Sequence, residues 1–419
     1  MLTSPTGRRT RRAAACLAAA AALALTASGC ATGGSGEEDG DGGSGPLKIG
    51  TLLPQTGALA FLGPPEIAGV NVAQAEINET GGIGGEDVEV LHRDSGDTTT
   101  DLASQSTTEL LNEGVGAVIG PPSSGVTQTV INQITGAGVL QISPGATSPE
   151  LTDWDDGDFF FRTAPSDVLQ GRVLGNYMVS QGAQSIGLIV LNDAYGTGLA
   201  ENVRLSVEEA GGEIVAESLF NEGDSQFTSQ VDEVVGADPD AIAVISFDQA
   251  KSIVPLLTAR DVTPDQLFFV DGNTADYSAD FDPGTLEGAA GTQPGAFAGQ
   301  DLRDRLLEDD PELENFNYAA EAYDATALTA LGAIAAGSSD PEAIRDQLTD
   351  LSQGGEKCEG FTACRELLDA DPSADIDYDG YSGPISFSDK GDVTEATIGV
   401  YVYDGDNVPQ PDSEESGKL

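Results

Sequence analysis

The feature that most constrains this fold is a regular alternation of short apolar runs with longer amphipathic runs, which begins at Leu47. The apolar runs are rich in Val, Ile and Leu and have no polar face, as is typical of strands buried on both sides of a parallel sheet. The amphipathic runs between them have the length and period of helices. Because crossovers between parallel strands are right-handed, the pattern predicts doubly wound α/β sheets with helices on both faces.

This alternation occurs twice along the chain. The first series has strand-like runs at residues 48–54, 88–94, 117–120 and 139–143, with helix-like runs at 66–78, 100–112 and 125–135. The second has strand-like runs at 186–191, 213–219, 241–247 and 267–270, with helix-like runs at 198–210, 225–235 and 248–260. Helical patterns at 318–335 and 341–351 follow, and then a predicted hairpin of residues 383–387 with 394–403. Two tandem units of this size predict two lobes.

Residues 1–29 have the organisation of an export signal. Four Arg between positions 8 and 12 precede an apolar stretch, Ala13 to Leu25, that is too short to span a bilayer. The stretch ends in Ala27-Ser28-Gly29-Cys30, which resembles the lipobox of bacterial lipoproteins, although the position of Ala27 is more often Leu. We therefore expect Cys30 to be lipidated and residues 30–46, rich in Gly and acids, to form a flexible tether. An ordinary secretory signal followed by a chance cysteine is the alternative.

Cysteine usage agrees with an exported chain. Of the four Cys, one lies in the signal and Cys30 is the expected lipidation site, which leaves Cys358 and Cys364. Two thiols this close in an exported protein favour a small-loop disulfide. A metal site is the alternative, but it needs further Cys or His nearby and the sole histidine is His92. We expect no bound metal and no cofactor.

The charge excludes one class of partner. The formal net charge is −52, and because residues 1–29 hold four Arg and no acid, the remaining chain carries −56. No cluster of Lys and Arg follows Arg12, so phosphate neutralisation, and with it nucleic-acid binding, is excluded. Such acidity favours disorder in chains poor in apolar residues, but 39% of this chain is hydrophobic and falls in the periodic runs. We read the acids as the solvated surface of an exported protein, which suits a saline habitat.

Polar residues follow several predicted strands. The loops are residues 120–125, 143–148, 192–196 and 271–273. Open α/β sheets bind ligands at the carboxyl ends of their strands, and hydroxyl groups beside backbone amides at helix starts suit a carboxylate or another small polar group. Each loop taken alone has a plainer interpretation as an N-cap or a turn. Their recurrence after successive strands favours a small-molecule site.

The order of motifs between residues 47 and about 404 resembles the branched-chain amino-acid binding proteins of bacterial ABC importers. The matching segments are Ile49 to Gly57, Gly81 to Gly85, Ile119 to Gly125, Ile142 to Glu150, Phe161-Arg162-Thr163 with Asp167, Tyr195-Gly196, Ala322 to Ala325, and Gly383 to Phe387 followed by Gly391-Asp392. No single motif is specific, but their order and spacing are. The resemblance implies a type I periplasmic-binding-protein fold, with two doubly wound, Rossmann-like lobes joined by a three-segment hinge. The implied lobes are residues 47–164 with about 292–390, and 165–291 with about 391–405; residues 406–419 are expected to be a polar, frayed tail.

The resemblance also assigns binding residues. Ser124 matches a serine that binds the ligand carboxylate, and Gly145, Ala146 and Thr147 match the strand-end segment that holds the carboxylate and ammonium groups. On the second lobe, Tyr195 matches a tyrosine that lines the cleft.

Four further residues complete the expected site. Phe247 takes the place of an aromatic lid residue, and Phe61 is either an apolar wall of the cleft or lobe core. An acid of the second lobe commonly pairs with the ligand ammonium in that family. The nearby candidates are Asp271 and Asp276, but Asn273 falls about where that acid is expected. Asn there would suit an amide, a dipeptide-like compound or a simple carboxylate better than an α-amino acid.

The implied function is that of an extracytoplasmic solute-binding lipoprotein on the outer face of the bacterial cytoplasmic membrane. It would capture a small polar ligand, a branched-chain or related amino acid, and deliver it to an importer permease by hinge closure, as a monomer held to the membrane by its lipid. An enzyme is disfavoured because the sequence has no Gly-x-Ser-x-Gly elbow, Walker loop or His-Glu-x-x-His motif. The alternative function is a sensing lipoprotein for amides, urea-like compounds or small carboxylates that signals to a separate partner.

Overall fold

The first lobe is built on a five-stranded parallel sheet. The computed structural model describes residues 46–419, so the signal and Cys30 lie outside the described residues. The sheet has the order β2-β1-β3-β4-β5, and every pairing in it is parallel. Its strands are β1 (Lys48–Leu53), β2 (Glu89–Asp94), β3 (Ala117–Ile119), β4 (Leu140–Ser143) and β5 (Phe160–Arg162). Its helices are α1 (Gly63–Glu79), α2 (Leu102–Glu113), α3 (Ser124–Thr135), α8 (Gln300–Asp309), α9 (Ala319–Ala336), α10 (Pro341–Leu351) and α11 (Gly360–Ala370).

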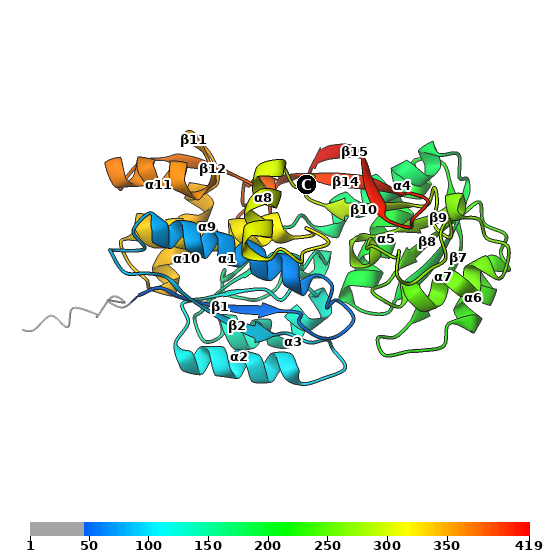
Figure 1. The fold of residues 1–419 in the computed structure, drawn as a ribbon, viewed down its shortest axis with the longest axis horizontal. Helices are drawn as coiled ribbons and strands as arrows, with labels where there is room; N and C mark the ends of the chain where they lie inside the picture. The colour runs from blue at the N-terminus through cyan, green and yellow to red at the C-terminus, as the bar shows by residue number, and fades with distance from the viewer. Residues whose placement is uncertain (1–45) are drawn as a thin grey trace, which may run out of the picture. The chain divides into compact units, whose positions relative to one another are not determined.

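The core of this lobe lies around α9, which is buried along most of its length (Figure 1). The helix is rich in alanine, so neighbouring helices can approach it closely. At Gly69 on α1 an added Cβ would lie 2.2 Å from the carbonyl oxygen of Ala319, so only glycine permits this approach. The small residues of α9 and α1 therefore determine how closely the two helices pack.

The second lobe is built on a seven-stranded sheet of order β15-β14-β10-β9-β8-β6-β7 (Figure 1). Its parallel strands are β6 (Ser185–Leu191), β7 (Glu213–Phe220), β8 (Ala241–Ile245), β9 (Leu267–Phe269) and β10 (Ala290–Pro294); β14 (Glu395–Tyr403) and β15 (Pro409–Lys418) are antiparallel at one edge. Its helices are α4 (Asp167–Ser180), α5 (Ala194–Glu209), α6 (Thr228–Val235) and α7 (Ala250–Thr258).

The chain passes between the two sheets three times: after β5, after β10 and before β14. This topology confirms the predicted fold class of two doubly wound lobes joined by three segments. Most helices and strands predicted from periodicity exist within a few residues of their expected ends, and the helix predicted at 341–351 coincides with α10. Among residues 46–419, no helix has the length and apolar character that crossing a membrane requires.

Two predictions about the C-terminal region are wrong. The expected frayed tail forms β15, which pairs with the whole of β14. The expected hairpin of residues 383–387 with 394–403 is reduced to one bridge between Phe387 and Val393, because β14 pairs with β10 and β15 instead. Both errors have one cause. The strand β15 is polar on both faces, as an edge strand can be, so its sequence does not show the apolar pattern of a strand. The partner of β14 could therefore not be predicted.

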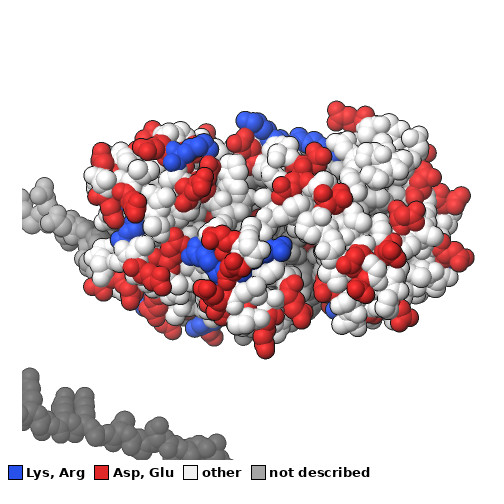
Figure 2. Space-filling view, turned by 45° about the horizontal axis from the view of Figure 1, so that its top comes forward, with Lys and Arg blue, Asp and Glu red and all other residues white. Residues whose placement is uncertain are grey.

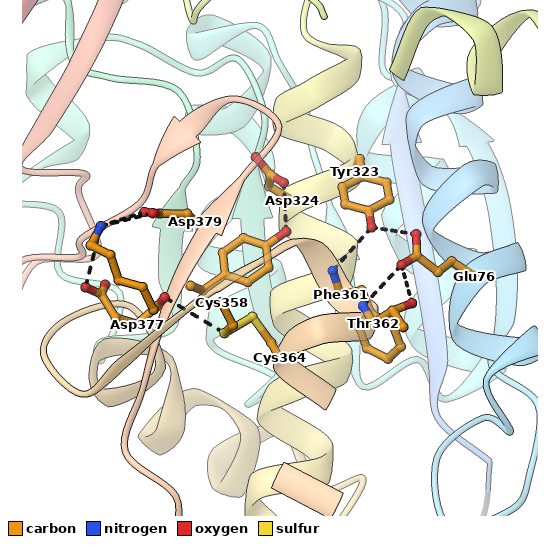
Figure 3. Close-up of a disulfide and its surroundings, with 11 residues drawn as sticks. Glu76, Tyr323, Asp324, Cys358, Phe361, Thr362, Cys364, Asp377 and Asp379 are labelled. Carbon is orange, nitrogen blue, oxygen red and sulfur yellow. Dashed lines mark hydrogen bonds and ion pairs between the residues drawn. A yellow bond between two sulfur atoms is a disulfide. The ribbon is translucent and has the colours of Figure 1, made fainter. Parts of the chain in front are cut away.

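The disulfide between Cys358 and Cys364 is confirmed (Figure 3). It joins β11 (Glu356–Glu359) to α11, beside a small sheet with β12 (Ile376–Gly380) and β13 (Gly383–Pro384). The residues around the disulfide belong to the core of the first lobe, because Phe361 and Cys364 are fully buried. Glu76 of α1 anchors the start of α11 by accepting hydrogen bonds from the Thr362 backbone N–H (3.1 Å) and hydroxyl (2.6 Å).

Candidate functional site

The first lobe contributes the loop after β4, which is held by hydrogen bonds to serine hydroxyl groups. After β4, the Ser143 hydroxyl accepts hydrogen bonds from the backbone N–H groups of Gly145 (3.3 Å) and Ala146 (2.9 Å). Ser124, the first residue of α3, accepts one from the Ser148 N–H at 3.1 Å. Thr147 between them is fully buried, and its hydroxyl has no hydrogen-bond partner among the described residues. The loop therefore presents one uncommitted hydroxyl group beside the N-terminus of a helix.

Arg162 holds this loop in place. Its side chain is fully buried and donates to the carbonyl oxygens of Ala146 (3.1 Å) and Ser148 (2.8 Å). Its Nε donates to Asp392, which lies in the third segment between the lobes, at 2.6 Å. One guanidinium thus ties the candidate binding loop to the hinge, and its bidentate geometry makes Lys a poor substitute.

The second lobe contributes a buried carboxylate, Asp271. It accepts hydrogen bonds from the hydroxyls of Tyr195 (2.6 Å) and Tyr318 (2.6 Å) and from the side-chain amide of Gln170 (2.9 Å). Burial raises the pKa of Asp271 above its usual value, although these hydrogen bonds oppose the shift. Tyr318 immediately precedes α9 of the first lobe, so the cluster joins residues of both lobes.

A second carboxyl group, Asp167, lies in the same buried region. It is the first residue of α4 and is fully buried, and neither of its side-chain oxygens has a hydrogen-bond partner among the described residues. Burial, and then the negative charge of Asp271, raise the pKa of Asp167 well above its usual value, while the neighbouring Thr147 hydroxyl and the positive charge of Arg162 lower it. The ion pair of Arg162 is with Asp392, so neither of these two carboxyl groups is part of an ion pair among the described residues. A positively charged group placed there would favour the ionised form of both acids.

The remaining predicted residues fall in different surroundings. Phe247 stacks on Tyr195, with ring centroids 5.4 Å apart. Phe61 is half-buried and packs with its neighbours against the core of the second lobe, and its carbonyl oxygen accepts a hydrogen bond from Asn315 at 3.1 Å.

Asn273 differs from the expectation that it takes the place of an acid in the cleft. Its amide oxygen accepts from the Val270 N–H (2.8 Å), and its amide nitrogen donates to the Val244 carbonyl (2.7 Å) and the Ser246 hydroxyl (2.8 Å). All these bonds stay within the second lobe and join the ends of β8 and β9. The acid that faces the first lobe is Asp271, two residues earlier.

Three residues of this cluster, Asp167, Gln170 and Tyr318, were given no role from the sequence. Asp167 appeared only as part of a matching motif. The usable signal was its place at a helix start, two residues after Pro165 and next to Ser166, where an acid is ordinarily a capping residue. Distinguishing a cap from a ligand-facing acid requires knowing what lies opposite.

Hydrogen bonds also join the lobes around the site. The Ser148 hydroxyl donates to the carbonyl oxygen of Ala194 at 2.8 Å, and the hydroxyl and backbone N–H of Thr98 both donate to Glu222. Thr147, Asp167 and Asp271 are 4% exposed or less. A ligand can reach them only when the lobes separate.

The family is shown by a match over most of the chain. A family model described as a periplasmic binding protein matches residues 46–363. The chain belongs to the periplasmic binding protein family. This is a family of substrate-binding proteins, and membership implies an extracytoplasmic location. The resemblance to the branched-chain amino-acid type of these proteins is confirmed.

Two curated relatives and one solved structure illustrate the similarity. This periplasmic binding protein is 29% identical over 310 residues to the leucine-, isoleucine-, valine-, threonine- and alanine-binding protein of Pseudomonas aeruginosa, covering 72% of this chain and 82% of that one. It is 28% identical over 357 residues to BasB, a chemotactic signal transduction system substrate-binding protein of Halobacterium salinarum, covering 82% and 84%. The structure of the branched-chain amino acid transporter substrate-binding protein LivJ from Streptococcus pneumoniae, in complex with isoleucine, superposes with a TM-score of 0.71 at 26% identity, over 90% of this chain and 100% of that one.

Proposed function

We propose that this periplasmic binding protein captures a small α-amino acid, a branched-chain or related one, in the buried region around Thr147, Asp167 and Asp271. The observation that carries the proposal is the pair of buried carboxyl groups, Asp167 and Asp271, whose pKa values are both raised by burial and which lie beside the Thr147 hydroxyl. Burying like charges together without a counter-charge is costly. The cost is removed when a ligand brings the missing cation.

The ligand carboxylate would lie at the first-lobe end. There the N-terminus of α3, with Ser124 as its first helical residue, offers backbone N–H groups and the positive end of a helix dipole. The uncommitted hydroxyl of Thr147 adds a donor. Gly145 and Ala146 would contribute backbone groups.

The ligand ammonium would lie between Asp271 and Asp167. Tyr195 and Tyr318 already orient the Asp271 carboxylate through hydrogen bonds of 2.6 Å. The stacked rings of Tyr195 and Phe247 would provide an apolar wall for the ligand side chain. Relatives named for leucine, isoleucine and valine binding support that choice of side chain.

Delivery to an importer permease would follow from hinge closure. Because the site is buried and lined from both lobes, ligand binding favours the state in which the lobes are together. An importer would recognise that state. We further propose that Cys30 carries the lipid that holds the protein, as a monomer, at the outer face of the membrane.

The test is a calorimetric titration with leucine, isoleucine and valine, together with two analogues that each lack one charge. 4-Methylpentanoate lacks the ammonium of leucine, and isopentylamine lacks its carboxylate. We expect binding of at least one amino acid and a loss of roughly tenfold or more for both analogues, since each leaves buried charged partners unpaired.

Two variants complete this test. Asp271→Asn should weaken amino-acid binding by at least about tenfold. Asp276→Asn, which removes the same charge from an exposed neighbouring position, should leave affinity unchanged. Equal affinity of wild type and Asp271→Asn, or tighter binding of 4-methylpentanoate than of leucine, would refute the placement of the ammonium.

A second candidate function is ligand sensing. It is favoured by the similarity, over 82% of this chain, to BasB, a substrate-binding protein of a chemotactic signal transduction system. Both functions use the same ligand site. They differ in which membrane protein binds the closed, ligand-bound form. Ligand-dependent pull-down of a permease supports import, whereas ligand-dependent pull-down of a membrane receptor supports sensing.

A further inference from the structure

A cavity lies beside the segment that links β10 to α8. It has a volume of about 220 Å³ and is lined by residues of both lobes and by the linking segment itself. We call it the hinge pocket; the side chains used below are Gln293, Arg303, Tyr318, Glu321 and Tyr401. Of the ligand cluster described above, Tyr318 alone also lines this pocket. The hinge pocket therefore shares one residue, Tyr318, with that cluster.

Arg303 is the unusual residue of the hinge pocket. Within residues 46–419 it is the one Lys or Arg side chain with neither an ion pair nor a hydrogen bond. Its guanidinium lies over the ring of Phe316, 4.9 Å from the centroid, and its Nε is buried without a partner. In a chain with 70 acids and 18 bases, an arginine without an acidic partner is unexpected. A buried donor without an acceptor is costly.

Glu321 supplies a second uncommitted group. It is 3% exposed, and no hydrogen bond joins its carboxyl to any other described residue. Burial raises the pKa of Glu321 to about 8, so at pH 7 the carboxyl is neutral and offers an O–H donor. Gly295, with φ of +94°, makes room for it, because an added Cβ would lie 2.2 Å from Oε1 of Glu321. Gln293, 4% exposed, likewise has no hydrogen bond on its side-chain amide.

The charged surroundings favour one orientation of a ligand. The ionisable groups near Glu321 and around the pocket are Glu66, Asp276, Arg303, Glu314, Tyr318, Asp324 and Tyr401. Asp276 and Glu314 are exposed rim residues, and neither forms an ion pair with Arg303. Among the described residues, Arg303 is the one basic residue that lines the hinge pocket, so it is the group that favours a negatively charged ligand atom there.

We propose that the hinge pocket binds a small molecule through its carboxylate, held by Arg303 and by the O–H of Glu321. The volume is below that of ordinary drug-sized sites, which restricts the ligand to a few non-hydrogen atoms. Because both lobes line the pocket, its occupancy favours the arrangement that brings these residues together. The proposal goes beyond the proposed function and does not depend on which ligand the main site takes.

The test uses trifluoroacetate as a fluorine NMR probe of the full-length chain, with displacement by propionate. Wild type should show saturable binding at pH 7, and Arg303→Gln should weaken it at least about tenfold, because a charged hydrogen-bond partner is lost. Arg345→Gln is the matched control: it removes the same charge from an arginine that lies over Phe159, 4.5 Å from its centroid, away from the pocket. It should leave binding unchanged.

Glu321→Gln and the pH dependence provide a second readout. In wild type, affinity should fall about tenfold from pH 7 to pH 9 as Glu321 ionises and repels the carboxylate. Glu321→Gln keeps a neutral donor, so it should bind at pH 7 and lose this pH dependence.

An Asp271→Asn background separates this site from the main one. Binding of the probe should persist in that background. Displacement there by alanine would identify a zwitterionic amino acid as the source of the carboxylate, and displacement by propionate alone would identify a simple carboxylate. Binding that never saturates, equal affinity in Arg303→Gln and wild type, or equal loss in Arg345→Gln would overturn the proposal.

Discussion

At the scale of single residues, the two hydroxyl-bearing site residues of the first lobe have different roles. The Ser124 hydroxyl is already engaged with the Ser148 N–H at 3.1 Å, whereas the Thr147 hydroxyl has no partner among the described residues. Replacing the Ser124 side chain is therefore expected to affect the fold and the site together. Thr147 separates the two effects.

Thr147→Val is expected to weaken ligand binding without weakening the fold. Valine has the shape of threonine, and replacing an unpartnered buried hydroxyl by a methyl group is close to neutral for stability. Ligand affinity should fall by roughly 1–3 kcal/mol, the cost of losing one buried polar contact. Calorimetry and urea unfolding on the same preparation measure both quantities. A loss of stability with unchanged affinity would contradict the assignment of Thr147 to the site.

Asp193 makes the stability of the fold depend on pH. It caps α5 by accepting a hydrogen bond from the Gly196 N–H at 2.7 Å, and burial raises its pKa from 3.8 to about 6. Since the folded state favours the protonated form, the stabilisation from this group is complete below pH 4 and is lost as the pH rises through 6. Asn is an equally good capping residue and cannot ionise.

Asp193→Asn should therefore gain stability relative to wild type as the pH rises from 4 to 7. The expected gain is up to about 3 kcal/mol, because each pKa unit corresponds to about 1.4 kcal/mol. Urea unfolding at both pH values measures it. Asp340→Asn, at the exposed cap of α10, controls for the loss of a capping charge. A difference between Asp193→Asn and wild type that is the same at pH 4 and pH 7 would contradict the expectation.

At the scale of elements, α11 shows how a segment without a strong pattern becomes part of the core. Phe361, Cys364 and Leu368 recur at helical spacing and are all buried. Glycines and acids flank this short apolar pattern on both sides, so the pattern is weak in the sequence. Contacts made by Glu76 and the disulfide, both visible in Figure 3, fix the helix in place.

The disulfide should stabilise the protein modestly. A Cys358→Ala/Cys364→Ala variant is expected to lose about 2 kcal/mol of unfolding free energy, the value that loop-closure entropy gives for so short a loop. Urea denaturation of the variant against wild type measures it. Treating wild type with a reductant is the matched control and should give a similar loss. An unchanged denaturation midpoint in both would show that the disulfide adds no stability. Leucine affinity should be unaffected, because the proposed ligand site lies elsewhere.

At the scale of the whole molecule, acids dominate the surface. Asp and Glu side chains spread over the face shown in Figure 2, with few Lys and Arg among them. Most ion pairs of the described residues have an exposed or half-exposed partner and therefore contribute little. Long-range repulsion among the remaining acids is uncompensated.

Salt should therefore stabilise the protein. The melting temperature is expected to rise by several degrees between about 0.05 M and 1 M NaCl, because the screening length falls to about 3 Å. Thermal unfolding followed by circular dichroism measures the change, and sucrose at matched osmolality controls for solvent exclusion. If NaCl has no effect, the interpretation of the acidic surface as suited to a saline habitat should be abandoned.

Local patterns along the chain were enough to predict most of the secondary structure, the two lobes and the disulfide. Periodicity predicted most strands and helices, because a buried strand or an amphipathic helix shows its surroundings in the residues that compose it. The tandem series predicted two lobes, and cysteine spacing predicted the disulfide. The order of motifs pointed to the family.

Which side chains meet could be learned only from the folded arrangement of the whole chain. Asp271 rather than Asn273 faces the first lobe because a single tight turn directs the two side chains differently. Asp167 joins Asp271 from more than a hundred residues away, β15 completes β14, and Arg303 is left without a partner beside Glu321. Each of these outcomes depends on what lies opposite a residue in space. Pairing between distant segments is set by packing of the whole chain, which no local pattern records.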